Sequence, residues 1–152
     1  MTATPSPNGA GSLQRPDAAE KPVVRPIEDA YPLTRIQQAL LVRCLAYPDQ
    51  PLYTGQWWAV LDGELDEQAF CAAWQGVVDR HTALRSGFHW DLKDHPFQVV
   101  HRLSALPIAR HDWNGAANWR AQLDALLAQD RDQAFDIKKP PLMRLALVRL
   151  AP

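Results

Sequence analysis

The sequence has only two cysteines, Cys44 and Cys71, and both fall inside segments with helical spacing. Disulfide-stabilised secreted domains carry a spaced set of cysteines, so this pattern excludes a disulfide scaffold and favours a reduced, cytoplasmic protein. We interpret both residues as small buried side chains.

Long apolar runs and clusters of basic residues are also absent. The apolar stretches are too short to cross a bilayer, and the first residues lack the basic-then-apolar pattern of a signal peptide. The formal net charge is −1, whereas nucleic-acid binding needs an excess of Lys and Arg to neutralise phosphates. The sequence therefore predicts neither a membrane nor a nucleic-acid partner.

Familiar catalytic signatures are missing as well. There is no GxSxG elbow, and none of the seven glycines forms a phosphate-binding loop. His89, His95 and His101 lie across a predicted hairpin, but their spacing matches no metal-ligand pattern, so no metal site is predicted. We interpret Asp130 and Asp132 as a solvated charged run rather than a glycosidase pair.

Hydrophobic residues make up 47% and charged residues 22% of the 152 residues, which is typical of one compact domain with a core. Residues 1–25 mix Pro, Ala, Gly and Ser without an apolar period. They are predicted to form a disordered leader or linker. Residues 26–152 are predicted to form the ordered part.

Three helices are predicted. Thr34 and Gln37 have the spacing of a capping box, and Asp66 is a good N-cap before a single apolar stripe. That stripe predicts that the second helix packs on a sheet. The helices are predicted to start at Thr34, Asp66 and Ala116 and to end near Tyr47, His81 and Gln129.

Alternating residues predict strands over 55–63, 84–90 and 97–102, near Ile108, and over 142–150. Residues 55–63 are apolar on both sides, which predicts a strand covered on both faces. We interpret Trp57 and Trp74 as core residues. The strongly apolar last strand is expected to need two neighbours, so the sheet is expected to be incomplete. The fold class is α+β, a mixed sheet packed with helices.

Residues 27–41 read IEDAYPLTRIQQALL, and residues 79–90 read DRHTALRSGFHW. These two stretches resemble motifs of the condensation domains of nonribosomal peptide synthetases. The first resembles the family's YPL-(S/T)-x-x-Q opening, although Arg35 stands where proline is common. Residues 79–90, DRHTALRSGFHW, match its RHxxLRxxF motif. The matching residues are Tyr31, Pro32, Leu33, Thr34 and Gln37, and Arg80, His81, Leu84, Arg85 and Phe88.

The resemblance implies the N-terminal subdomain of a chloramphenicol acetyltransferase-like fold, in which two subdomains enclose a tunnel. Peptidyl or acyl carrier proteins would deliver thioesters on phosphopantetheine arms, and an amide would form. The family's HHxxxDG motif is absent from this chain, which contains no His-His pair. We therefore expect a scaffold and tunnel wall that needs the remainder of the domain and is inactive alone, with no catalytic residue of its own.

In the family, the second arginine of RHxxLRxxF resembles an ion-pair partner of the HHxxxDG aspartate. Since that aspartate is missing, Arg85 is expected to be unpaired or solvated. Arg80 and His81 are interpreted as favourable residues at a helix C-terminus.

Two alternatives stay open from the sequence. The chain could be a non-catalytic module that docks carrier proteins or self-associates through an open sheet edge. It could also be the front half of an epimerisation or heterocyclisation domain, because these share the early motifs.

Overall fold

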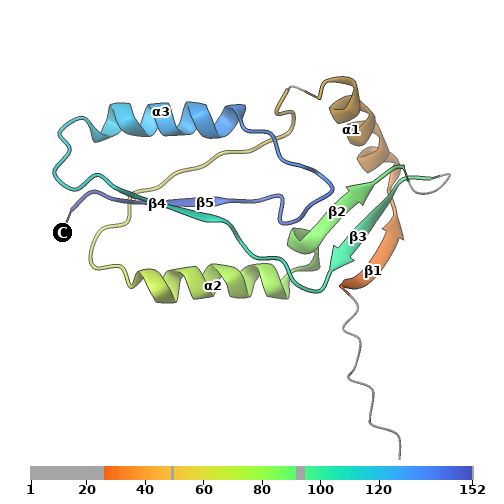
Figure 1. Cartoon of the computed structure of the whole chain (residues 1–152), viewed down its shortest axis with the longest axis horizontal. Coiled ribbons are helices and arrows are strands. Elements are labelled where there is room, and N and C mark those ends of the chain that lie inside the picture. The colour runs from red at the N-terminus through yellow and green to blue at the C-terminus, as the bar shows by residue number, and fades with distance from the viewer. Residues whose placement is uncertain (1–25, 49, 92–94, 152) are drawn as a thin grey trace, which may run out of the picture.

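A computed structural model describes residues 26–48, 50–91 and 95–151. The leader predicted for residues 1–25 lies outside this part of the chain. The elements are β1 (Ile27–Pro32), α1 (Arg35–Ala46), α2 (Glu67–Arg80), the 3-10 turn η1 (Thr82–Arg85), β2 (Ser86–His89), β3 (Phe97–His101), β4 (Ile108–Asp112), α3 (Trp119–Asp132) and β5 (Leu145–Arg149). Figure 1 shows α2 and α3 on either side of the β4–β5 pair, with α1 beside the other three strands.

The first sheet has the order β1-β3-β2 and is antiparallel throughout. Its β2–β3 hairpin confirms the predicted pairing, and its central strand buries Val99 and Val100. Strand β1 was missed, because all six of its residues are exposed and show no apolar face. The position of β1 is fixed by its backbone hydrogen bonds to β3, and these cannot be predicted from a pattern of side chains.

The second sheet pairs β4 with β5 in parallel, from Ile108 opposite Leu145 to Asp112 opposite Arg149. Both strands were predicted. Within the described residues, β5 has this single neighbour, so the sheets are small and not closed. The α+β class is confirmed.

The helix caps follow the sequence. Thr34 Oγ1 accepts from the Gln37 backbone N–H at 3.3 Å, and Gln37 Oε1 accepts from the Thr34 N–H at 2.9 Å, which completes the predicted capping box. Asp66 caps α2 through the Ala69 N–H at 2.9 Å. Helix α3 begins at Trp119, three residues later than predicted, because a turn occupies 117–118.

Helix α2 is fixed from two sides. Val78 is completely buried. The side chain of Gln75 donates to the Ser104 carbonyl at 2.9 Å and accepts from the Leu106 N–H at 3.0 Å. The helix is thereby attached to the loop that leads into β4.

The strand predicted for residues 55–63 is wrong. This segment is extended but has no ladder partner among the described residues, and Trp57 is 95% exposed. The interpretation of Trp57 as a core residue is therefore also wrong, whereas Trp74 is half-buried on α2. An alternating pattern shows which side chains are apolar on each side of an extended chain. A strand also needs a neighbouring strand to pair with its backbone N–H and C=O groups.

Both cysteines are free and half-buried. None of the helices in the described ranges has the length and hydropathy needed to span a bilayer.

At Gly87, strand β2 packs closely against the loop that precedes β5. A Cβ atom at Gly87 would lie 2.4 Å from the Lys138 carbonyl oxygen, and the Phe88 N–H donates to the Ile137 carbonyl at 2.8 Å. Because the atoms in contact belong to the backbones of Gly87 and Lys138, a change of side-chain rotamer cannot relieve the contact.

We predict that Gly87→Ala lowers the free energy of unfolding of the 152-residue chain by about 1–3 kcal/mol through overpacking. Urea denaturation measures this change. Gly76→Ala on the exposed side of α2 is the control, since a Cβ there meets nothing within 4 Å and should add up to about 1 kcal/mol. Equal stability of Gly87→Ala and the parent chain would contradict the close approach.

Candidate functional site

Arg85 is the one charged residue that is buried in the described part of the chain, with 4% of its surface exposed. It closes η1, directly after α2 and before β2. A guanidinium removed from water must have its hydrogen bonds replaced, because an unpaired buried charge is strongly unfavourable.

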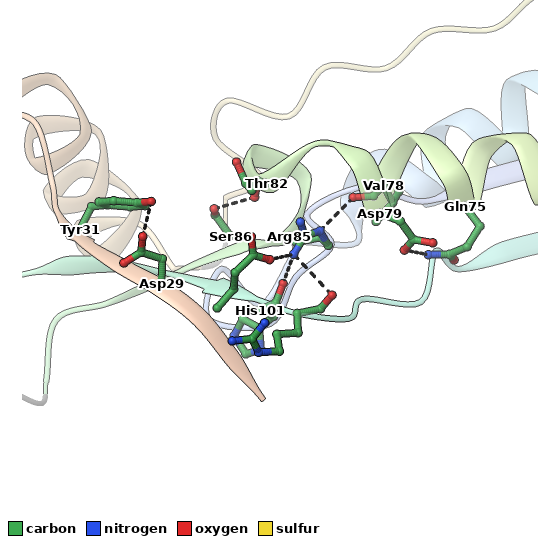
Figure 2. A network of polar contacts seen from close by, with 11 residues as sticks. Asp29, Tyr31, Gln75, Val78, Asp79, Thr82, Arg85, Ser86 and His101 are labelled. Atoms are coloured by element: carbon green, nitrogen blue, oxygen red, sulfur yellow. Dashed lines mark hydrogen bonds and ion pairs between the residues drawn. The ribbon is translucent and has the colours of Figure 1, made fainter. Parts of the chain in front are cut away.

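The surrounding segments supply those partners, as Figure 2 shows. Arg85 Nε donates to the Val78 carbonyl at 3.2 Å, and Nη1 donates to the carbonyl oxygens of His101 and, at 3.4 Å, Arg102. Nη1 also lies 2.6 Å from Glu28 Oε2. Arg85 thus joins α2, β1 and the end of β3.

The expectation that Arg85 is unpaired or solvated is wrong. Its carboxylate partner, Glu28, belongs to the opening motif, 57 residues earlier in the chain. The β1–β3 register shifts between Ile27 and Asp29, which leaves Glu28 in a bulge. A bulge redirects the side chain of its extra residue, so the two motifs meet through a contact that no spacing in the sequence announces.

The RHxxLRxxF motif forms the turn from α2 into the first sheet. Arg80 lies in the last helical turn and His81 is the C-cap, whose N–H donates to the Val77 carbonyl at 3.1 Å. Leu84 and Arg85 lie in η1, and Phe88 lies in β2. The predicted strand over 84–90 therefore begins only at Ser86, because the chain first completes a 3-10 turn.

The opening motif fastens α1 to the central strand. Tyr31 and Pro32 pair with Gln98 and Phe97 of β3. Leu33, which follows them, is buried. Gln37, besides completing the cap, donates from Nε2 to Gln98 Oε1 at 3.2 Å.

A second polar cluster lies on α3. Asp130 accepts from Arg144 Nε and, at 2.8 Å, from Gln56 Nε2. Partial burial alone would raise the pKa of Asp130, but the hydrogen bonds from Arg144 and Gln56 outweigh it and hold the pKa below its usual value. The interpretation of Asp130 as solvated is therefore wrong, because a long-range partner approaches it from the loop before β5. Asp132 is exposed.

An open cleft of about 1900 Å³ lies beside the second cluster, and Gln56, Asp130 and Arg144 are among the residues that line it. Residues 50–65 and 142–151 line it continuously, together with inward side chains of α3. No group of three or more metal-ligating side chains exists among the residues that the structure describes. What the geometry provides is a buried arginine with a partly exposed carboxylate partner, and a wide, mostly apolar cleft.

Residues 27–152 match the family described as "Condensation domain". The chain belongs to the condensation-domain family. The matched region is the N-terminal half of the domain, as the resemblance implied.

The curated relatives are peptide synthetases. This condensation-domain chain is 41% identical over 128 residues to a linear gramicidin synthase of Brevibacillus parabrevis, and 31% identical over 125 residues to bacitracin synthase 3 of Bacillus licheniformis. These matches cover 83% and 82% of the chain but 2% of each relative.

Solved condensation domains share the fold. The starter condensation domain of rhizomide synthetase matches with a TM-score of 0.70 and 26% identity, over 82% of this chain and 31% of that chain. The first condensation domain of the calcium-dependent antibiotic synthetase matches in fold with a TM-score of 0.69 and 18% identity, over 82% and 30%. The chain thus spans about a third of the solved domains.

Sequence reasoning missed Glu28, Gln56 and Gly87. Glu28 lies within the opening motif but outside its recognised pattern, and its role depends on a bulge. Gln56 donates to the Leu127 carbonyl and to the Asp130 side chain of α3, and Gly87 lies against the backbone of the 137–140 loop. Nothing in the sequence around Gln56 or Gly87 specifies these distant partners.

We predict that Arg85→Ala lowers the free energy of unfolding by about 3–5 kcal/mol, the usual cost of removing one partner of a buried charged cluster. Much of the loss should come from the orphaned carbonyls, because the Glu28 side chain is 37% exposed and can regain water. Glu28→Gln should therefore cost no more than about 1 kcal/mol.

Arg80→Ala is the matched control, since Arg80 belongs to the same motif but is exposed. Urea denaturation of the three variants separates the cases. An Arg85→Ala chain that is no less stable than Arg80→Ala would show that the buried contacts do not hold the motif.

His101 gives a pH prediction. Burial, with a smaller effect of the positive charge on His89, lowers the pKa of His101 below its ordinary 6.5. The unfolded chain then takes up a proton before the folded chain does, so stability contributed by His101 above about pH 6.5 is lost as the pH falls.

We expect the free energy of unfolding to fall between about pH 7 and pH 5, and to fall less in His101→Gln. The exposed His95→Gln is the control and should follow the parent profile. Parallel profiles for His101→Gln and the parent chain would contradict this assignment.

Proposed function

We propose that this chain forms part of an enzyme that makes amide bonds between carrier-bound acyl and aminoacyl thioesters. The observation that carries the proposal is the match of residues 27–152 to condensation domains, with RHxxLRxxF at the α2–β2 turn. The chain would act as scaffold and as one wall of the substrate tunnel.

The buried cluster supports a scaffold role. Arg85 uses three of its hydrogen bonds on backbone carbonyls, which leaves no exposed guanidinium for a substrate. We infer that its task is to hold α2, β1 and β3 in register. In the intact domain, the aspartate of HHxxxDG would join Glu28 at this arginine.

We propose peptidyl or acyl carrier proteins and the remainder of the domain as partners. The substrates would arrive as thioesters on phosphopantetheine arms. Mutant forms of the rhizomide starter domain were solved with C8-CoA, alone and together with Leu-SNAC. Because CoA contains a phosphopantetheine arm, these complexes support thioester substrates for this chain's parent domain too.

We further propose a cytoplasmic location, where such carriers would be found. Both cysteines are free, which fits a reducing compartment.

We predict that the intact condensation domain, given two loaded carrier proteins, forms an amide product, while the 152-residue chain alone forms none. The chain contains no His-His pair to handle the proton. Mass spectrometry of the acceptor carrier detects the product.

The same assay separates the alternatives. A product lighter by one water indicates heterocyclisation, and an inverted amino acid indicates epimerisation. Carrier binding without transfer by the intact domain indicates a docking module. Turnover by the 152-residue chain alone would overturn the proposal that it is a scaffold.

A further inference from the structure

Strand β1 is an edge strand of the first sheet. The sheet has the order β1-β3-β2, so β3 covers one side of β1 and no strand of the described residues covers the other. All six residues of β1 are exposed. An uncovered edge of this kind is a template for a further strand, such as β1 of a second copy of this chain.

The ladder to β3 shows which backbone groups of β1 face its free edge. In an antiparallel ladder, the N–H and C=O of successive residues point alternately toward the neighbouring strand and away from it. The Leu33 N–H donates to the Pro96 carbonyl at 3.2 Å, one step beyond the pair of Pro32 and Phe97. Leu33 and Tyr31 therefore face β3, whereas Ala30 and Pro32 face the free edge.

Neither of the two residues that face the free edge offers a hydrogen-bond donor to a partner. The Ala30 N–H donates to Oδ1 of the preceding residue, Asp29, at 2.7 Å. Pro32 has no N–H at all. Since a ladder needs donors and acceptors from both strands, a strand placed against this part of β1 would find carbonyl oxygens only.

The side chain of Asp29 is held in this position by a second contact. The Tyr31 hydroxyl donates to Asp29 Oδ2 at 2.5 Å, as Figure 2 shows. The hydrogen bond from Tyr31, followed by that from the Ala30 N–H, lowers the pKa of Asp29 below its usual value. Asp29 is therefore charged at neutral pH, and β1 of a second copy would bring a like charge beside it.

The opposite edge of the first sheet, at β2, is covered by another part of the same chain. The Phe88 N–H donates to the Ile137 carbonyl at 2.8 Å. The next residue of that segment, Lys138, is fixed over β2 by two contacts of its Nζ atom, which lies 2.7 Å from Asp91 Oδ2 and 4.4 Å from the centroid of the Trp90 ring. Residues 137–138 therefore occupy the place of a further strand.

We propose that the first sheet is closed to strand addition at both edges, and that Asp29, Tyr31 and Pro32 close it at β1. A second copy of this chain accordingly does not pair with β1, although the strand is exposed along its whole length. Replacement of Asp29 and Pro32 turns β1 into a docking edge for that second copy. The inference rests on contacts within the chain and is independent of the proposed function.

Sedimentation of the 152-residue chain over a series of concentrations tests the proposal. The double variant Asp29→Ala/Pro32→Val restores both donors and removes the charge. It should form dimers with a dissociation constant at least about 10-fold lower than that of any association of the parent chain, because two additional hydrogen bonds become available in each copy. Asp29→Ala alone should show a smaller decrease.

The single variant also keeps the test decisive if Pro32→Val disturbs folding next to the buried Leu33. Asp124→Ala is the matched control, since it removes one negative charge from an exposed position of α3, away from the sheet. It should associate as the parent chain does. If neither Asp29 variant associates more tightly than Asp124→Ala, the proposal is wrong.

Hydrogen exchange locates the contact. Amides of residues 27–33 should exchange at the same rate at all concentrations of the parent chain, and more slowly at high concentrations of the double variant, because ladder amides exchange only after opening. Residues 108–112 of β4 are the internal control. Slower exchange of residues 27–33 in the concentrated parent chain would overturn the proposal, as would dimers of the double variant that protect β4 and leave β1 unprotected.

Discussion

The guanidinium of Arg85 lies where three parts of the chain converge, and each part supplies it with an oxygen atom. A buried positive charge cannot be left without partners, so α2, β1 and the end of β3 have to keep their positions relative to one another. The hairpin, the opening strand and the start of α1 are all connected to this point. In this structure, Arg85 of the RHxxLRxxF motif therefore holds neighbouring segments of the chain in place.

The second half of the described chain has a different character. Helix α3 contacts the two segments that line the cleft, residues 50–65 and 142–151, through a half-buried cluster of Asp130, Gln56 and Arg144. The large apolar side chains of residues 57–65 are exposed, whereas Leu145, Leu147 and Val148 of β5 are half-buried. The first sheet has buried residues at its centre, Val99 and Val100 of β3. In the second sheet, no residue of β4 or β5 is fully buried.

Local signals predicted the helices well. The capping box at Thr34, the N-cap at Asp66 and the hairpin were specified by residues within a few positions of each other. The errors came from long-range contacts. Strand β1 depends on a backbone ladder to β3, and Glu28 reaches Arg85 through a bulge. The segment 55–63 shows the reverse case, since its side chains alternate as in a strand but no described residue forms a ladder with it.

The bulge at Glu28 also determines how tolerant β1 is to insertions and deletions. All six residues of β1 are exposed, so no buried face distinguishes one alignment with β3 from the next. The register of β1 against β3 is instead fixed by the bulge between Ile27 and Asp29, because the Glu28 carboxylate in this bulge pairs with Arg85. Deletion of one residue between Glu28 and Tyr31 would leave the composition of β1 nearly unchanged. It would nevertheless shift residues 31–34 by one position along β3, and the start of α1 would shift with them.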